Sequence, residues 1–87
     1  MNTRLAVIAI VVEKHDSTAS INALLHDASQ YIIGRMGVPY RERGISLISV
    51  ALDAPQDVIS ALSGRIGALP GVSAKTVYSN VISSIQT

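Results

Sequence analysis

Four segments of the chain have the length and residue types of β-strands. Residues 5–12 and 45–52 are almost continuously apolar, which is typical of strands that are covered on both faces. Residues 31–38 contain two glycines and lead into Pro39, features that a sheet tolerates at an edge or a bulge. Residues 72–78 carry a lysine, as edge strands often do. We therefore expect the first and third strands in the centre of a sheet and the other two at its edges.

Two segments between these strands repeat apolar residues at helical spacing. The first, residues 18–29, follows Asp16 and Ser17, whose side chains are suited to cap a helix. The second opens at Pro55, a residue favoured at the first helical position, and stops at Gly67. The two apolar stripes consist of Ile21, Leu24, Leu25 and Ala28 in the first helix and Val58, Ile59, Leu62 and Ile66 in the second.

The resulting order of elements, βαββαβ, predicts a ferredoxin-like α+β sandwich. In that plan a four-stranded antiparallel sheet has two helices on one face. We expect residues 1–78 to form this single domain. The pattern assigns no clear element to residues 79–87, which we treat as a C-terminal tail whose apolar residues could add contacts to an assembly.

Neither face of the first strand is polar. One face carries Ala6, Ile8, Ile10 and Val12, and the other carries Leu5, Val7, Ala9 and Val11. Two helices can cover only one of these faces, and a large exposed apolar surface is unusual on a monomer. The pattern therefore predicts a homo-oligomer, either a dimer or a tetramer built from dimers, joined through the open sheet face or the sheet edges. A lysine at whichever of Ile8 and Ile10 points away from the helices should split it.

Composition narrows the classes of function. The chain has 87 residues, a formal net charge of +1 and no cysteine. The charge provides no electrostatic basis for binding nucleic acid. Without cysteine there can be no disulfide, thiolate zinc site, iron–sulfur cluster or thiol nucleophile, and a reducing cytoplasm fits this composition. The longest apolar run is far shorter than the roughly 20 residues that span a membrane, and no cleavage site of a signal peptide follows it.

Three arginines lie close together in sequence around the turn between the second and third strands. Arg35, Arg41 and Arg43 accompany Tyr40 there, and guanidinium groups recognise carboxylates and phosphates through paired N–H donors. One hypothesis is a site for a small anionic effector or an acidic partner. The other is a hairpin kept soluble by its charges, with Glu42 as an ion-pair partner.

Candidates for catalysis are sparse. His15 and His26 are the only histidines, and their pattern does not form a metal site or a nucleophile–base arrangement. Gly64 and Gly67 belong to the end of the second helix, where close helix packing and a helix stop explain them better than phosphate binding. We therefore expect neither an enzyme nor a bound metal or cofactor.

Six short segments together resemble one family: residues 7–13, 22–26, 35–41, 61–67, 70–72 and 75–77. Through them, nearly the whole of residues 5–78 is similar to the regulators of the iron-only hydrogenase system. The resemblance implies an ACT-like fold, similar to the C-terminal domain of nickel-responsive repressors. It also implies a cytoplasmic regulatory or ligand-sensing oligomer. The alternative is a structural assembly factor that docks onto a hydrogenase maturation protein.

Two departures limit what the resemblance implies. ACT domains that bind amino acids have an Asp-x-Pro-Gly type of turn after the first strand, but residues 13–17 contain neither Gly nor Pro. The nickel-responsive repressors bind metal through clustered His residues and a Cys and have a ribbon-helix-helix segment, whereas this chain has neither that ligand cluster nor that segment. We therefore expect no amino-acid site of that kind, no nickel sensing and no direct binding to DNA.

Overall fold

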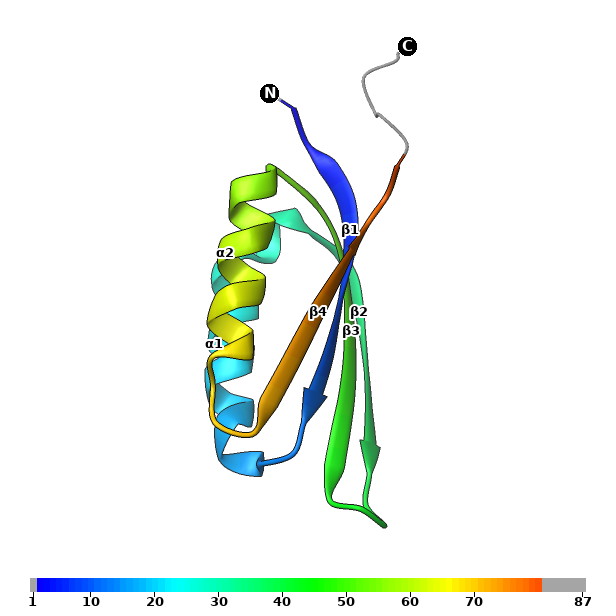
Figure 1. Cartoon of the computed structure of the whole chain (residues 1–87), viewed down its shortest axis with the longest axis vertical. Coiled ribbons are helices and arrows are strands. Elements are labelled where there is room, and N and C mark those ends of the chain that lie inside the picture. Colours follow the sequence, from blue (N-terminus) through cyan, green and yellow to red (C-terminus); the bar gives the residue numbers. More distant parts are fainter. Residues whose placement is uncertain (1, 81–87) are drawn as a thin grey trace.

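The computed structural model describes residues 2–80, and its centre is one antiparallel sheet (Figure 1). The strands run in the order β2-β3-β1-β4, so that the two apolar strands are central and the two glycine- or lysine-bearing strands are at the edges. Their bounds are β1 Arg4–Val12, β2 Ile32–Tyr40, β3 Ile45–Ala54 and β4 Val72–Tyr78. The predicted strand order and sheet are confirmed.

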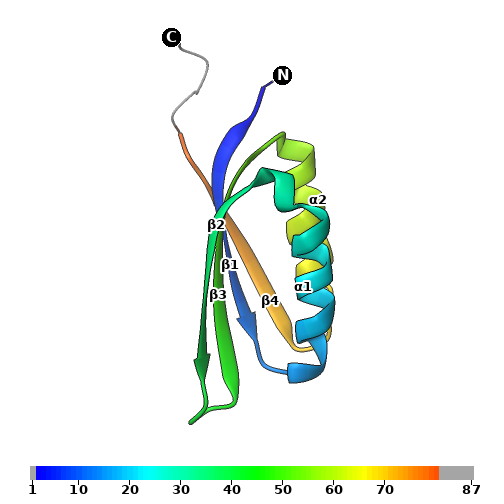
Figure 2. The same cartoon turned by 180° about the vertical axis from the view of Figure 1, so that it is seen from behind.

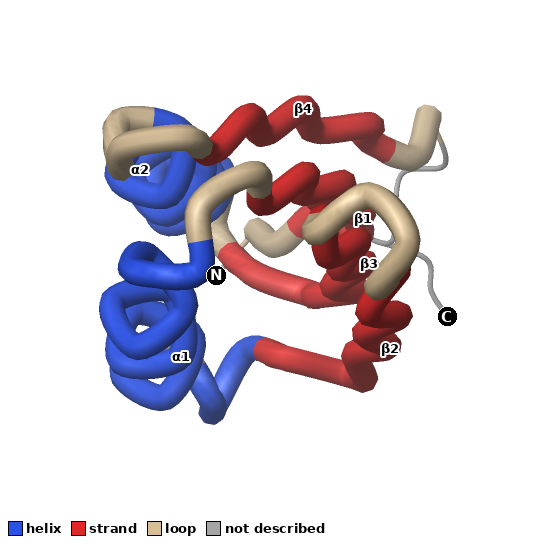
Figure 3. Tube along the Cα trace, turned by 90° about the horizontal axis from the view of Figure 1, so that it is seen from below, coloured by secondary structure: helices blue, strands red, loops and turns tan. Residues whose placement is uncertain are grey.

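Both helices pack on the same face of the sheet (Figures 2 and 3). They are α1, Thr18–Asp27, and α2, Gln56–Gly67. Pro55 is the N-cap of α2 and not its first helical residue, so the helix begins one residue later than expected. α1 ends sooner than the pattern indicated, because the chain tightens into a 3₁₀ turn at Ser29–Tyr31 before it enters β2. The α+β ferredoxin-like fold is therefore confirmed, with small shifts at the ends of the helices.

The core between helices and sheet is entirely aliphatic. Ile8 and Ile10 from β1 lie against Ile21 of α1 and Ile59 of α2, and all four side chains are almost completely buried. Since Ile8 and Ile10 both point toward the helices, neither is the position that faces away. That position on β1 belongs to the other set, Leu5, Val7, Ala9 and Val11.

A bulge in β2 decides which of its residues face the helices. Ile32 pairs with Leu52 and Gly34 pairs with Ala51, so one extra residue, Ile33, is accommodated between them. A bulge of this kind shifts the alternation of the strand by one position. As a result Arg35, which pairs with the buried Val50, lies on the helix side of the sheet.

Two loops are fastened together at one end of the helix layer. The backbone N–H of Glu13 donates to the carbonyl oxygen of Gly71 at 2.7 Å, and the buried hydroxyl of Ser17 donates to the carbonyl oxygen of Pro70 at the same distance. Gly71 has a φ of 70°, a conformation that favours glycine. The turn before β4 thus fixes the segment that links β1 to α1.

Gly64 does not have the packing role that its position suggested. No atom lies within 4 Å of the point where a Cβ would stand at Gly64, so close helix packing is wrong there. At Gly67 such a Cβ would lie 3.6 Å from the Cβ of Ala74, and Gly67 is the last residue of α2 as expected. The close approach of α2 to β4 therefore occurs one turn later than predicted.

Candidate functional site

The face of the sheet away from the helices is apolar and exposed. Every one of the eight large hydrophobic side chains that are exposed in the described structure belongs to this face, which we call the open face. These side chains are Leu5, Val7, Ile33, Met36, Val38, Tyr40, Leu47 and Val77. Such clustering on one side differs from the scattered hydrophobic residues of an ordinary surface, and marks a site of interaction.

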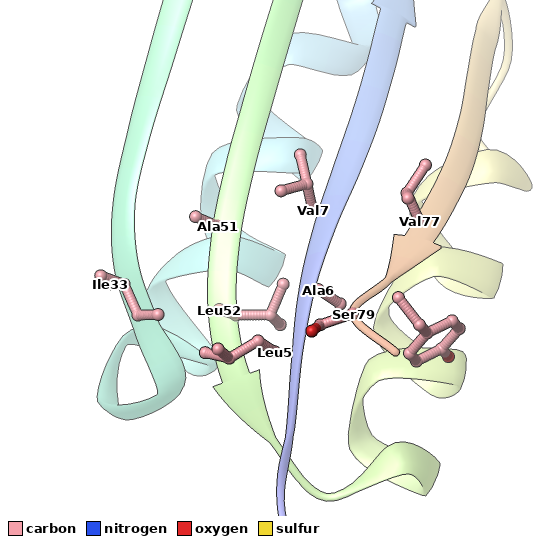
Figure 4. Close-up of a pocket in the computed structure, with 9 residues that line it drawn as sticks. Leu5, Ala6, Val7, Ile33, Ala51, Leu52, Val77 and Ser79 are labelled. Atoms are coloured by element: carbon pink, nitrogen blue, oxygen red, sulfur yellow. The ribbon is translucent and has the colours of Figure 1, made fainter. Parts of the chain in front are cut away.

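Part of the open face is hollowed into a shallow depression of about 290 Å³ (Figure 4). It lies over the first residues of β1, with Leu5 and Val7 from that strand, Ile33 from β2 and Val77 from β4 around it. Small side chains such as Ala51 leave the space between the larger ones. The depression is lined mainly by carbon atoms, so it suits an apolar side chain better than a polar ligand.

Only two charged side chains stand on the open face within the four described strands. Lys75 of β4 pairs with Ala9, and Asp53 of β3 pairs with Leu5. Val7 lies midway between Ala9 and Leu5 on β1, and β4 and β3 flank β1 on opposite sides. One positive and one negative charge therefore stand at equal offsets on either side of Val7.

The three arginines of the sequence prediction do not converge. The Nη2 atom of Arg35 donates to Oδ1 of Asn22 at 3.0 Å, on the helix side of the sheet. Arg41 and Arg43 lie in the turn between β2 and β3, where the backbone N–H of Arg43 bonds the carbonyl oxygen of Tyr40 at 3.2 Å. Six residues of extended chain separate Arg35 from Arg41 by about 20 Å. Binding of an anion by these residues stays a prediction, and a single site made by all three is not formed in this arrangement.

The two histidines also lie apart. His15 begins the 3₁₀ turn before α1, whereas His26 is in the last turn of that helix, and both are exposed. Among residues 2–80, no three side chains of the metal-binding types come together. In the same range, no helix is long and apolar enough to cross a membrane.

A cluster around Arg4 was not expected from the sequence. Its guanidinium group lies 4.4 Å from the ring centre of Tyr78, donates to Oε1 of Gln56 at 3.2 Å and to the carbonyl oxygen of Ser79 at 3.3 Å. These contacts join the start of β1 to α2 and to the end of β4. Residues so distant in sequence carry no local signal of this contact, which only the topology of the sheet creates.

A family model described as "TM1266-like: Iron-only hydrogenase system regulator, putative" matches residues 4–76. Among solved structures, the uncharacterized protein TM1266 from Thermotoga maritima is 38% identical, with a TM-score of 0.84 over 87% of this chain and 96% of that one. No curated protein matches the sequence.

Two more distant structures share the fold alone. A formyltetrahydrofolate deformylase from Pseudomonas putida is 16% identical, with a TM-score of 0.65 over 88% of this chain but 30% of that one. An unknown protein from Galdieria sulphuraria is 17% identical, with a TM-score of 0.61 over 94% of this chain and 48% of that one. The fold described above therefore also forms part of longer chains.

Proposed function

Because the chain belongs to the TM1266-like family of iron-only hydrogenase system regulators, we propose that it is a non-catalytic regulatory module that works as a homo-oligomer. The observation that carries this proposal is the apolar open face, which gathers all the large exposed hydrophobic side chains of the described structure. In this proposal the module senses a small anionic effector in the cytoplasm, and its open face is the surface through which two copies join.

The charges on the open face favour a second copy as its occupant. A twofold axis between two such faces can pass over Val7 and run at right angles to the line from Lys75 to Asp53. Because these two residues stand symmetrically about Val7, that axis brings each Lys75 to the Asp53 of the other copy. The same arrangement packs apolar side chains of both copies against each other. The face is thus complementary to itself in charge as well as in hydrophobicity.

Sedimentation velocity at micromolar concentration tests this assembly. We expect the wild-type chain to sediment as a dimer or a tetramer, and Val7→Lys to sediment as a folded monomer, because an interface cannot bury an unpaired charge cheaply. Ala23→Lys is the matched control: it places the same charge on the exposed side of α1, away from the open face, and should leave the oligomer intact. A wild-type mass near 9.2 kDa at all concentrations would overturn the proposal.

Charge reversal tests the register of the two copies. Lys75→Asp and Asp53→Lys should each weaken the oligomer, because each places like charges together at the interface. The double variant restores the opposite charges with their positions exchanged, and should recover the association. If the double variant is no better than the single ones, the twofold axis over Val7 is wrong even where the open face forms the interface.

The assembly-factor alternative has a different signature. In that case the open face would be covered by a hydrogenase maturation protein, so the isolated chain would be monomeric, and the Val7→Lys variant would lose the partner. A monomeric wild-type chain in the sedimentation experiment would therefore favour the assembly factor over the homo-oligomer.

A further inference from the structure

A second hollow lies on the helix side of the sheet, between α1 and the edge strand β2. It has a volume of about 360 Å³ and is open to solvent. Six residues line it: Asn22, Leu25, His26, Ser29, Ile32 and Arg35. It lies along the second half of α1, and neither the open face nor the turn of Arg41 and Arg43 contributes to it.

The polar side chains of this pocket are all able to donate hydrogen bonds, and none is a carboxylate. The oxygen of the Asn22 amide accepts the bond from Arg35, so its –NH₂ group remains to donate. Arg35 has further N–H donors beyond the one that it uses for Asn22. His26 follows Asn22 by four residues and therefore lies on the same side of α1. The pocket can thus surround a negatively charged group with donors from two elements.

We propose that this pocket binds a small organic monoanion, namely a carboxylate with a short aliphatic body. Arg35 and the Asn22 amide hold the carboxylate, while the half-buried Ile32 provides apolar surface for the carbon atoms. A phosphate dianion fits less well. The pocket holds only one permanently positive side chain, which balances one negative charge but not two. The negative end of the α1 dipole, near His26 and Ser29, opposes any anion and opposes a dianion more than a monoanion.

The inference deepens the proposed sensing role, on which its biological meaning rests, by naming a site and a class of effector. It also separates Arg35 from Arg41 and Arg43, which do not line this pocket. The Asn22–Arg35 bond holds the guanidinium group in place before the ligand arrives, so little side-chain ordering remains to oppose binding.

NMR titration of the ¹⁵N-labelled full chain tests the pocket, with butyrate as the probe and inorganic phosphate as the comparison. We expect saturable shifts of the Asn22 side-chain amide and of backbone signals around Ser29 with butyrate, and weaker binding of phosphate. Arg35→Gln should weaken butyrate binding about tenfold, since a bond to a charged group contributes about 1.5 kcal/mol. Asn22→Asp should abolish it by placing a carboxylate in the pocket.

The matched control is Arg43→Gln, which removes the same charge from the chain at a position outside the pocket. Butyrate affinity should be unchanged in this variant. The NMR spectra of both the Arg35→Gln and the Arg43→Gln variants should show that the fold is kept. An equal loss in Arg43→Gln, the absence of saturable shifts, or tighter binding of phosphate would each overturn the inference. Sedimentation of the same samples reports the oligomer separately, so that a failure of the pocket is distinguishable from a failure of the proposed assembly.

Discussion

The two faces of the sheet differ in what covers them, although both are apolar. On β1, Ile8 has no exposed surface beneath the helices, whereas its neighbour Val7 is 41% exposed on the open face. Adjacent residues of one strand therefore serve different purposes. Burial within the chain stabilises the fold, but apolar area left exposed by the monomer can stabilise only an assembly.

Truncation of Ile8 and of Val7 to alanine should give the largest difference in the free energy of unfolding. Ile8→Ala removes three buried carbon atoms and leaves a cavity, so we expect it to lower the free energy of unfolding by about 3–4 kcal/mol. Val7→Ala should cost less than about 1 kcal/mol in the monomer, because its side chain is already in contact with solvent. Urea unfolding at protein concentrations low enough to dissociate the oligomer measures the free energy of unfolding of both variants. Equal losses would mean that the open face is covered within the single chain.

The two glycines with positive φ extend the comparison to the turns. Gly71 lies in the turn between α2 and β4, and a Cβ there would stand 2.5 Å from Cγ of Lys14. Nothing lies within 4 Å of the same point at Gly44 in the β2–β3 turn. Gly44→Ala should cost about 1 kcal/mol for backbone strain alone. Gly71→Ala should cost about 2 kcal/mol, because the Lys14 side chain must also move.

Thermal unfolding compares these two variants with the wild type. Lys14→Ala combined with Gly71→Ala should remove only part of the added cost at Gly71, since it deletes Cγ of Lys14 but leaves Cβ of that residue 2.8 Å from the new Cβ. If the two single variants are equally destabilised, the loop before α1 yields freely and is not fixed by the turn at Gly71.

A single hydrogen bond on the covered side should have a small effect. The hydroxyl of Thr76 donates to Oγ of Ser63 at 2.9 Å, which links β4 to α2. Thr76→Val keeps the shape of the side chain and removes the donor, so it should lower the free energy of unfolding by about 1 kcal/mol. Thr76→Ser keeps the hydroxyl and should retain the bond. Urea unfolding of both decides whether the bond or the methyl group matters more.

The pattern of apolar residues predicted most of the fold, because both central strands are almost continuously apolar and both helices have clear apolar stripes. It could not predict β2. Counting alternately from the inward-facing Ile32 would place Met36 toward the helices and Arg35 away from them, but the extra residue at Ile33 reverses both. The glycines of β2 are compatible with a bulge but do not give the position of the extra residue. The contact of Arg35 with Asn22 depends on that position, so the sequence could not predict it.

The apolar character of the open face was predictable from β1 and β3, since neither strand has a polar side. Which set of residues forms that face depends on where the helices pack. The symmetric placement of Lys75 and Asp53 about Val7 depends further on the register of three strands. Register is a long-range property that local residue preferences do not encode.

Both ends of the described chain leave the fold at the same pole, opposite the β2–β3 turn (Figure 1). The backbone N–H of Ser79 donates to the carbonyl oxygen of Leu5 at 2.9 Å, so the start of β1 and the end of β4 lie side by side. A tether attached at either end would therefore hold the molecule by one pole on a sensor surface or a bead. The β2–β3 turn at the far pole would stay accessible to ligands in solution, whereas a tether through that turn would invert the molecule.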